Sequence, residues 1–512
     1  MISLKKLDEV YLVIAADLLD VNFKDDLKQL ENIETYFSAF SENFQHTYAF
    51  KSGQWDGMTR FLRFVQYGSY IFPTGLLNQL IQYCDVNNIS VDIQFKIDDI
   101  YSNKVIDWKI FDNQLNLPEH FEKRSYQLEY VEEIFKTGRG CIISPTGSGK
   151  SAIIHMIIQN LMINEFKNDE KIILIVPTID LISQMYDEFV EYGFEDIDDY
   201  VYLLSGGIPK VFNKQITIST WQSLQHMPPE TFSIFSCLIV DECHGVSSTA
   251  EKLSYISHNC INAKYRIGTT GTTPEKKLDE MTMVSYLGPL IKKISTAELI
   301  EQGYLSTLSI KTTILHWKKK GGFDIGGFQD EYKAIVENEN RRNQILELCK
   351  QLTIRNNKQT ILVLGKRTDY LQQLSEDLKT LIGEDSVRLV TGKHVKKKAD
   401  RRDIYNEMRS DGGIIFATEK LAGTGLNIKN ISTVILATPL KSKVTVLQAI
   451  GRGVRKTDKS THLNVFDFVD RIPIAGPKKR INSSYKWVDS KENIYINECF
   501  TNKFYILNLP SV

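Results

Sequence analysis

The chain has 512 residues, a length at which roughly three domains of about 150 residues each are expected. With 42% hydrophobic and 24% charged residues, its composition is that of a globular protein. The 7 scattered cysteines form no C-x-x-C pair. Their spacing argues against a zinc site or a disulfide framework and favours a reducing compartment. A net charge of −1 gives no overall sign of a nucleic-acid partner, and the lack of a signal peptide or of an apolar run near ~20 residues predicts a cytoplasmic protein without a membrane partner.

Residues 1–112 are expected to form a small α/β domain, in which acids outnumber bases. Bases outnumber acids from about Lys318 onward, where they gather at 318–320, 396–398, 401–402 and 478–480. Basic clusters in one part of a chain fit contact with a polyanion, although any single cluster is more often a solvated surface.

From about residue 120, short apolar runs alternate with helical stretches, a pattern typical of doubly wound parallel sheets. The first set of expected strands is 141–143, 172–176, 216–218 and 238–240, and the second set is 360–364, 387–390, 413–416 and 433–436. We therefore expect an α/β fold with two such domains in tandem, 113–307 and 308–471, followed by a C-terminal extension, 472–512. Two such domains make a cleft, in which ligands of these folds often bind.

A glycine-rich loop, Ser144–Ser151, follows the first expected strand and precedes an apolar helix, which is the context that a phosphate-binding loop requires. The two glycines let the backbone approach phosphates, and the helix N-terminus attracts the anion. Lys150 is expected to reach the β and γ phosphates, and the Ser151 hydroxyl to bind Mg²⁺. The first glycine of the general pattern is Ser144 here, and a glycine-rich turn without a ligand is the alternative. The residues expected to hold ATP in this loop are Thr146, Gly147, Ser148, Gly149, Lys150 and Ser151.

Two adjacent carboxylates, Asp241 and Glu242, end the expected strand 238–240 and are followed by Cys243 and His244. Such carboxylates at a strand end are costly unless a cation or a reacting group needs them. With the phosphate loop upstream, Asp241 is expected to hold Mg²⁺, and Glu242 to orient or deprotonate the attacking water. For His244, the residues alone favour a hydrogen-bonded structural histidine.

Two arginines of the second domain, Arg452 and Arg455, lie three residues apart and share one face of an expected helix. Permanently charged guanidinium groups suit the charge that builds on a transferred phosphoryl group, so both are candidate catalytic residues together with Gln448. Supplied by a second domain, they would make hydrolysis depend on closure of the cleft. A pair of surface arginines is the alternative, which the neighbouring Gly451 and Gln448 disfavour.

Three loops that follow expected strands carry small hydroxyl residues and exposed backbone N–H groups, which bind phosphates without reading bases. The candidate nucleic-acid contacts in them are Pro177, Thr178, Thr220, Trp221, Gln222, Thr418, Gly423 and Thr424. Stacking on a base and capping the core are equally expected for the Trp221 ring. In the C-terminal extension, packing on the second α/β domain is favoured over nucleic-acid contact for Tyr485, Trp487, Phe500, Phe504 and Tyr505.

In their order, these motifs resemble those of the superfamily 2 helicases over roughly residues 120–470. Arg124–Gln127 looks like the adenine-binding Q motif, since a Gln amide matches both the donor and the acceptor edge of adenine. Asp241–His244 resembles a DExH-type motif II, Thr270–Thr272 is similar to motif III, and Gln448–Arg455 matches motif VI. The resemblance implies two tandem RecA-like domains that bind ATP and Mg²⁺ between them.

The resemblance also implies roles for single residues. Gly425 lies in a stretch that looks like motif V and is expected in the nucleotide site. In the family, the motif II histidine lies between the nucleotide and motif III. His244, Thr270 and Thr272 are therefore expected to couple the state of ATP to nucleic-acid contact.

A narrower resemblance is to the UvsW-like phage recombination and branch-migration DNA helicases. It rests on Gly53–Gly57, Pro73–Leu76, Leu440–Lys443 and Val446–Arg452. It implies that residues 1–112 bind DNA and that the protein remodels branched DNA with ATP, by fork regression, Holliday-junction branch migration and unwinding, in recombination, repair and replication. It also implies a phage protein that acts inside the host cell, with single-strand-binding or recombination proteins as partners.

Three other functions are compatible with the motor motifs. A motor subunit of a restriction system would need a nuclease, and the sequence has no convincing P-D…(D/E)-x-K signature. An RNA helicase is compatible because phosphate contacts do not distinguish the two sugars, although the N-terminal resemblance favours DNA. The third is an annealing or clamp module that uses ATP as a switch and does not unwind nucleic acid.

Overall fold

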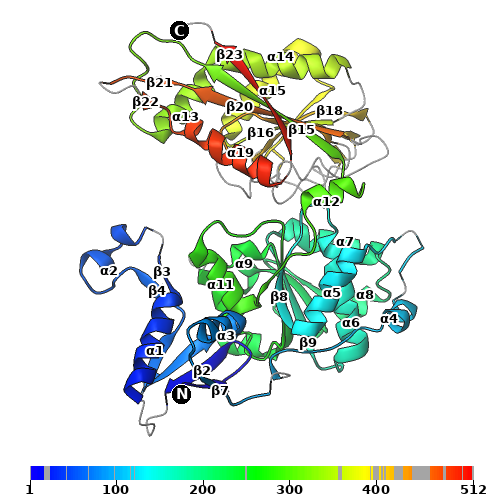
Figure 1. The fold of residues 1–512 in the computed structure, drawn as a ribbon. Helices are drawn as coiled ribbons and strands as arrows, with labels where there is room; N and C mark the ends of the chain where they lie inside the picture. Colours follow the sequence, from blue (N-terminus) through cyan, green and yellow to red (C-terminus); the bar gives the residue numbers. More distant parts are fainter. Residues whose placement is uncertain are drawn as a thin grey trace. The chain divides into compact units, whose positions relative to one another are not determined.

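The computed structural model describes residues 2–509 except 17–22, 42, 67, 97–98, 116, 120, 248–250, 356–359, 393, 396–402, 405–406, 409–410, 420–430, 441–461, 477–479 and 499. The chain divides into two compact units, one of Met1–Ser144 with Gly149–Lys293 and the other of Pro145–Ser148 with Ile294–Val512. Figure 1 shows their helices and strands. Within the described ranges, no helix combines the length and the apolar character that crossing a bilayer requires.

The first unit begins with a five-stranded sheet in the order β5-β6-β2-β1-β7. Its strands are β1 (Ile2–Lys6), β2 (Tyr11–Ala16), β5 (Arg63–Gln66), β6 (Ser69–Pro73) and β7 (Val91–Ile93), and its main helices are α1 (Phe23–Tyr36) and α3 (Leu77–Val86). The expected small N-terminal α/β domain is therefore confirmed. Its core extends into the following domain, because Leu278, Met281 and Val284 of α11 (Lys277–Leu287) belong to the same buried cluster.

Gly75 lies in close contact with α11, next to this shared core. A Cβ atom on Gly75 would lie 2.1 Å from the carbonyl oxygen of Val284 and 2.7 Å from that of Ser285. Because backbone atoms cannot rotate away, Gly75→Ala is expected to destabilise the first unit by about 1–3 kcal/mol, the usual cost of overpacking. Hydrogen exchange of the β2 amides measures this loss. Gly206→Ala, where the added Cβ would meet nothing within 4 Å, is the control, and equal exchange in the two variants would contradict the packing.

A seven-stranded parallel sheet completes the first unit, in the order β10-β11-β9-β12-β13-β8-β14. Its strands are β8 (Arg139–Ile143), β9 (Lys171–Val176), β10 (Val201–Leu204), β11 (Ile216–Thr220), β12 (Phe235–Asp241), β13 (Tyr265–Thr270) and β14 (Leu290–Ile291), and the helices used below are α5 (Ser125–Thr137), α6 (Lys150–Asn160) and α7 (Ile179–Glu191). All four strands expected in this region are confirmed. Since the sheet is parallel, the carboxyl ends of its strands meet at one edge, where such folds bind ligands.

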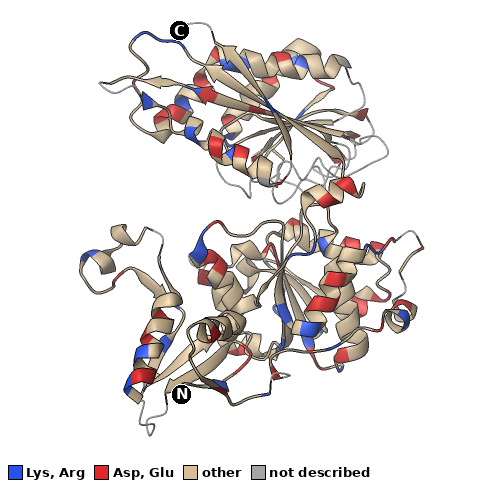
Figure 2. Cartoon of the chain, viewed as in Figure 1, with Lys and Arg blue, Asp and Glu red and all other residues tan. Residues whose placement is uncertain are grey.

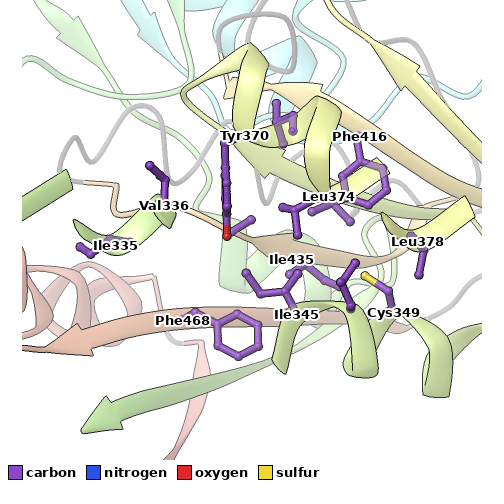
Figure 3. Close-up of a cluster of buried hydrophobic side chains, with 14 of the residues drawn as sticks. Ile335, Val336, Ile345, Cys349, Tyr370, Leu374, Leu378, Phe416, Ile435 and Phe468 are labelled. Carbon is purple, nitrogen blue, oxygen red and sulfur yellow. The ribbon is translucent and has the colours of Figure 1, made fainter. Parts of the chain in front are cut away.

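The second unit contains another seven-stranded parallel sheet, in the order β17-β18-β16-β19-β20-β15-β23. Its strands are β15 (Thr307–His316), β16 (Thr360–Gly365), β17 (Val387–Val390), β18 (Gly413–Thr418), β19 (Ile431–Leu436), β20 (His462–Arg471) and β23 (Thr501–Asn508). Helices α14 (Glu339–Arg355) and α15 (Thr368–Ile382) bury Cys349, Tyr370 and Leu374 against Ile435 and Phe468 of the sheet (Figure 3). The four strands expected here and the overall α/β fold class are confirmed.

The C-terminal segment is part of the second sheet, because β23 pairs with β15 along eight residues. Before it, Lys491 of α19 (Trp487–Asn497) donates to both carboxylate oxygens of the buried Asp467 at 2.8 Å. The aromatic residues expected to pack here differ in burial, and the Arg471 guanidinium lies 5.6 Å from the centre of the Tyr485 ring. Phe500 is buried and the Trp487 ring lies 5.2 Å from that of Phe328, as expected. The other two, Phe504 and Tyr505, are 41% and 47% exposed, so the expected packing is wrong for them because β23 is an edge strand.

Charged side chains of both signs cover the helices and loops, whereas the strands of both seven-stranded sheets are largely uncharged (Figure 2). Of the expected basic clusters, Lys318–Lys320 and Arg480 are described and exposed. The clusters at 396–398 and 401–402 lie outside the described residues, as do Lys478 and Lys479.

Candidate active site

The glycine-rich loop joins β8 to α6, which begins at Lys150. Gly147 and Gly149 have φ values of 85° and 81°, in the left-handed region that glycine tolerates best. A Cβ atom on Gly149 would lie 2.5 Å from Nε2 of Gln127, so the backbone here is held close to another side chain. Lys150 Nζ donates to the carbonyl oxygen of Ser144 at 3.4 Å. The structure thus has the tight turn and the helix start that a phosphate loop needs.

Gln127 lies in the first turn of α5 and is almost fully buried. Its Oε1 accepts the backbone N–H of Arg124 at 3.1 Å and so caps the helix, while its Nε2 lies beside Gly149. The Arg124 guanidinium donates to the hydroxyl of Tyr126 at 2.9 Å. The structure therefore brings Gln127 to the phosphate loop, and adenine binding by Arg124 and Gln127 stays a prediction.

Asp241 is the last residue of β12, and its Oδ1 accepts a hydrogen bond of 2.7 Å from Thr269 Oγ1 on the neighbouring strand β13. Burial and the neighbouring Glu242 carboxylate raise the pKa of Asp241 to about 6, while the Lys150 ammonium and Thr269 act in the opposite direction. The protein therefore does not fully offset the negative charge of the ionised Asp241 carboxylate, and a bound cation would do so. Asp241 and the start of α6 are suited to a magnesium–phosphate group.

Glu242 has a left-handed backbone with φ 51° and ψ 50°, a conformation that is rare for a residue with a side chain. Its Oε2 lies 3.3 Å from Nδ1 of His244 and 3.4 Å from Oγ1 of Thr270. His244 Nδ1 and Thr270 Oγ1 are themselves 2.9 Å apart, and Thr270 Oγ1 lies 3.0 Å from the carbonyl oxygen of Thr272. The structure thus brings together all four residues that the sequence assigned to water activation and coupling.

The Thr270 hydroxyl has one hydrogen and several acceptors within reach. It can donate to Glu242, to the carbonyl of Thr272 or to a neutral His244 nitrogen, but only to one of them at a time. A change in the charge of Glu242 would therefore change which bond Thr270 makes. Thr270 is the shared contact between the Glu242–His244 pair and the backbone of Thr272.

Two further residues contact this site that sequence reasoning did not single out. Thr269 holds Asp241, and the Tyr192 hydroxyl lies 3.0 Å from Ser151 Oγ. Thr269 directly precedes the stretch Thr270–Thr272, and the parallel pairing of β12 with β13 was the signal that could have found it. Tyr192 carries no local signal, since it lies 41 residues after Ser151.

The candidate nucleic-acid contacts of the first unit follow β9 and β11 at the same sheet edge. Thr178 is the residue before α7, and Gln222 is exposed. Thr220 is buried and its hydroxyl lies 3.1 Å from that of Ser223, so its side chain does not reach the surface. Trp221 is partly buried against the hydrophobic core, which favours its core-capping alternative. Pro177 is partly exposed at the end of β9.

Of the site residues expected in the second unit, only Thr418 is among the described residues. It ends β18 and is partly exposed. The remaining candidates of the second unit lie outside the described residues, namely Gly423, Thr424, Gly425, Gln448, Arg452 and Arg455.

Comparisons with known proteins match the chain to helicases, a DNA translocase and restriction-enzyme subunits. Residues 120–275 match the family model described as "Type III restriction enzyme, res subunit", and residues 343–457 match "Helicase conserved C-terminal domain". The chain is 28% identical over 487 residues to the ATP-dependent DNA helicase uvsW of Enterobacteria phage T4. The aligned region covers 92% of this chain and 92% of that relative.

More distant likenesses extend this result. The chain is 24% identical over 380 residues to the DNA 3'-5' translocase XPB2 of Sulfurisphaera tokodaii, covering 68% of this chain and 82% of that one. A solved fragment of a putative HsdR subunit of a type I restriction enzyme from Vibrio vulnificus has a TM-score of 0.56 at 17% identity, covering 97% of this chain and 88% of that chain. The likeness to the HsdR fragment shows that the two chains share a fold.

Proposed function

We propose that this chain, which belongs to the superfamily 2 helicases, uses ATP hydrolysis to translocate on and remodel branched DNA. The observation that carries the proposal is the cluster of Glu242, His244 and Thr270 beside Asp241, at the sheet edge where the phosphate loop begins. It occurs in a chain that is similar to a phage DNA helicase over 92% of its length, the N-terminal domain included. That extent supports a role in recombination, repair and replication, inside an infected host cell.

ATP and Mg²⁺ are the proposed cofactors. The residues that would hold them are Arg124, Gln127, Thr146, Gly147, Ser148, Gly149, Lys150, Ser151, Asp241 and Gly425. The left-handed glycines and the raised pKa of the partly buried Asp241 support this assignment. When bound, Mg²⁺ would neutralise charge on the β and γ phosphates.

The hydrolysis step depends on a proton acceptor beside the phosphate loop. Glu242 would take the proton of the attacking water, and His244 and Thr270 hold that carboxylate in place. Arg452, Arg455 and Gln448 of the second domain are proposed to stabilise the charge on the transferred phosphoryl group.

Coupling to DNA is proposed to pass through Thr270. When Glu242 gains a proton, the Thr270 hydroxyl loses its anionic acceptor and turns to the Thr272 carbonyl. The loop that Thr272 begins leads into α11, which shares a core with the N-terminal domain. The proposed DNA contacts are that domain, residues 1–112, and Pro177, Thr178, Gln222, Thr418, Gly423 and Thr424.

The test compares ATP hydrolysis stimulated by a four-way junction, a fork, single-stranded DNA and RNA. Junction and fork are expected to stimulate most, and Lys150→Ala should abolish the response because phosphate contact is lost. Unwinding of the junction is followed in the same samples. Stimulation by RNA alone would favour the RNA helicase, and annealing that needs no ATP turnover would favour the clamp module.

A second candidate is the motor subunit of a restriction system, which the family model matching residues 120–275 supports. Such a motor would act with a nuclease and a methylation-dependent target. DNA cleavage that requires this chain and ATP would favour it over branched-DNA remodelling.

A further inference from the structure

The side chain of Ser151 is held by a residue outside the helicase motifs. Ser151 Oγ lies 3.0 Å from the hydroxyl of Tyr192, the residue that follows α7. Ser151 is in the first turn of α6, so the contact links the start of the phosphate-loop helix to the end of the next helix.

The Tyr192 ring is fixed by packing on two sides. Its centroid lies 5.1 Å from that of Phe121, at an interplanar angle of 68°, and 5.6 Å from that of His155, at 60°. His155 is buried in α6 one turn after Ser151, and burial lowers its pKa to about 3, so it is a neutral packing partner. These contacts place the Tyr192 hydroxyl at a defined point relative to α6.

A serine hydroxyl turns among three staggered positions unless a partner selects one. When the Ser151 hydrogen is donated to Tyr192, the lone pairs of Ser151 Oγ are left for another partner. Mg²⁺ binds oxygen lone pairs in a near-ideal octahedral geometry, so the direction of each ligand matters. A preselected serine position reduces the cost of ordering that ligand when the metal arrives.

We propose that Tyr192 is a positioning residue that accepts the Ser151 hydrogen and thereby directs Ser151 Oγ to the Mg²⁺ of bound nucleotide. The inference rests on the proposed function, because it presupposes that Mg-ATP binds at this loop. It goes further in assigning a role in metal affinity to a residue that none of the motifs contains.

The experiment is Tyr192→Phe, which removes the hydroxyl and keeps the ring between Phe121 and His155. A fluorescent ATP analogue is titrated with Mg²⁺, and the Mg²⁺ concentration at half-maximal binding is measured. That concentration is expected to rise about five- to tenfold, the effect of one hydrogen bond. Affinity for the analogue in EDTA should stay unchanged, which also verifies that the variant is folded.

The matched control is Tyr186→Phe. Tyr186 lies in α7, the helix that Tyr192 follows, and donates its hydroxyl hydrogen to Asp198 at 2.6 Å, away from Ser151. Its removal should leave both measurements unchanged. In a Ser151→Ala background, Tyr192→Phe should have no further effect, because the oxygen that it positions is gone.

Each other outcome contradicts a specific step. An equal loss of affinity with Mg²⁺ and in EDTA would mean that Tyr192 supports the fold and not the metal ligand. The same shift in the Ser151→Ala background would also overturn the inference, because Tyr192 would then act without Ser151. If the unaltered protein bound no analogue in either condition, the proposed function itself would fail.

Discussion

Glu242→Gln is expected to lower the rate of ATP hydrolysis by about 10²- to 10⁴-fold while ATP still binds. Gln has the same shape as Glu and can still contact His244 and Thr270, but it cannot accept a proton from water. The Glu242 charge also helps to raise the pKa of Asp241, so its removal lowers that pKa and favours the ionised form. Binding of Mg-ATP should therefore be unchanged or tighter.

Single-turnover hydrolysis and binding of labelled ATP measure the two effects separately. Glu251→Gln, an exposed glutamate at the start of a nearby helix, is the control and should hydrolyse ATP at the normal rate. Junction unwinding should be lost with hydrolysis. A Glu242→Gln protein that still turned over ATP would remove Glu242 from the mechanism.

Arg341→Met is expected to destabilise the second unit by about 3–5 kcal/mol, the cost of leaving a buried charge without its partner. Arg341 and Asp470 are both fully buried, and Arg341 Nε donates to the two Asp470 oxygens at 3.0 and 2.9 Å. The same guanidinium donates to the hydroxyl of Tyr370 and to the carbonyl of Ala437. One side chain therefore connects α14 to α15, β20 and the residue after β19.

Hydrogen exchange of β20 amides measures the free energy of unfolding of this unit. The control is Arg367→Met, since Arg367 pairs with Asp369 in an exposed position, and such pairs contribute about 0–1 kcal/mol. Adding Asp470→Asn to Arg341→Met should recover part of the loss, because the amide carries no charge and still accepts from Trp317. Equal effects of Arg341→Met and Arg367→Met would contradict the role of the buried pair.

Whether a strand could be predicted from the sequence depended on how completely the folded protein buries it. Confirmed strands such as 172–176 and 238–240 are continuous apolar runs because helices and neighbouring strands bury both of their faces. β15 and β20 were not predicted, since buried residues alternate with partly exposed ones along them and polar residues such as Lys311 and Asp467 interrupt the pattern. The edge strand β23 was not predicted either; its apolar run, Phe504–Leu507, is short, and most of the strand is exposed.

The glycine-rich loop, the acidic pair at the end of β12 and the two-sheet architecture could be predicted from the sequence, because each depends on neighbours in the chain. The side chains that hold these groups could be identified from tertiary contacts alone. Thr269 reaches Asp241 through strand pairing, Tyr192 reaches Ser151 across 41 residues, and α11 enters the core of the N-terminal domain. Such contacts leave no periodic pattern, because a hydrogen bond between distant residues needs only two matching groups and a fold that brings them together.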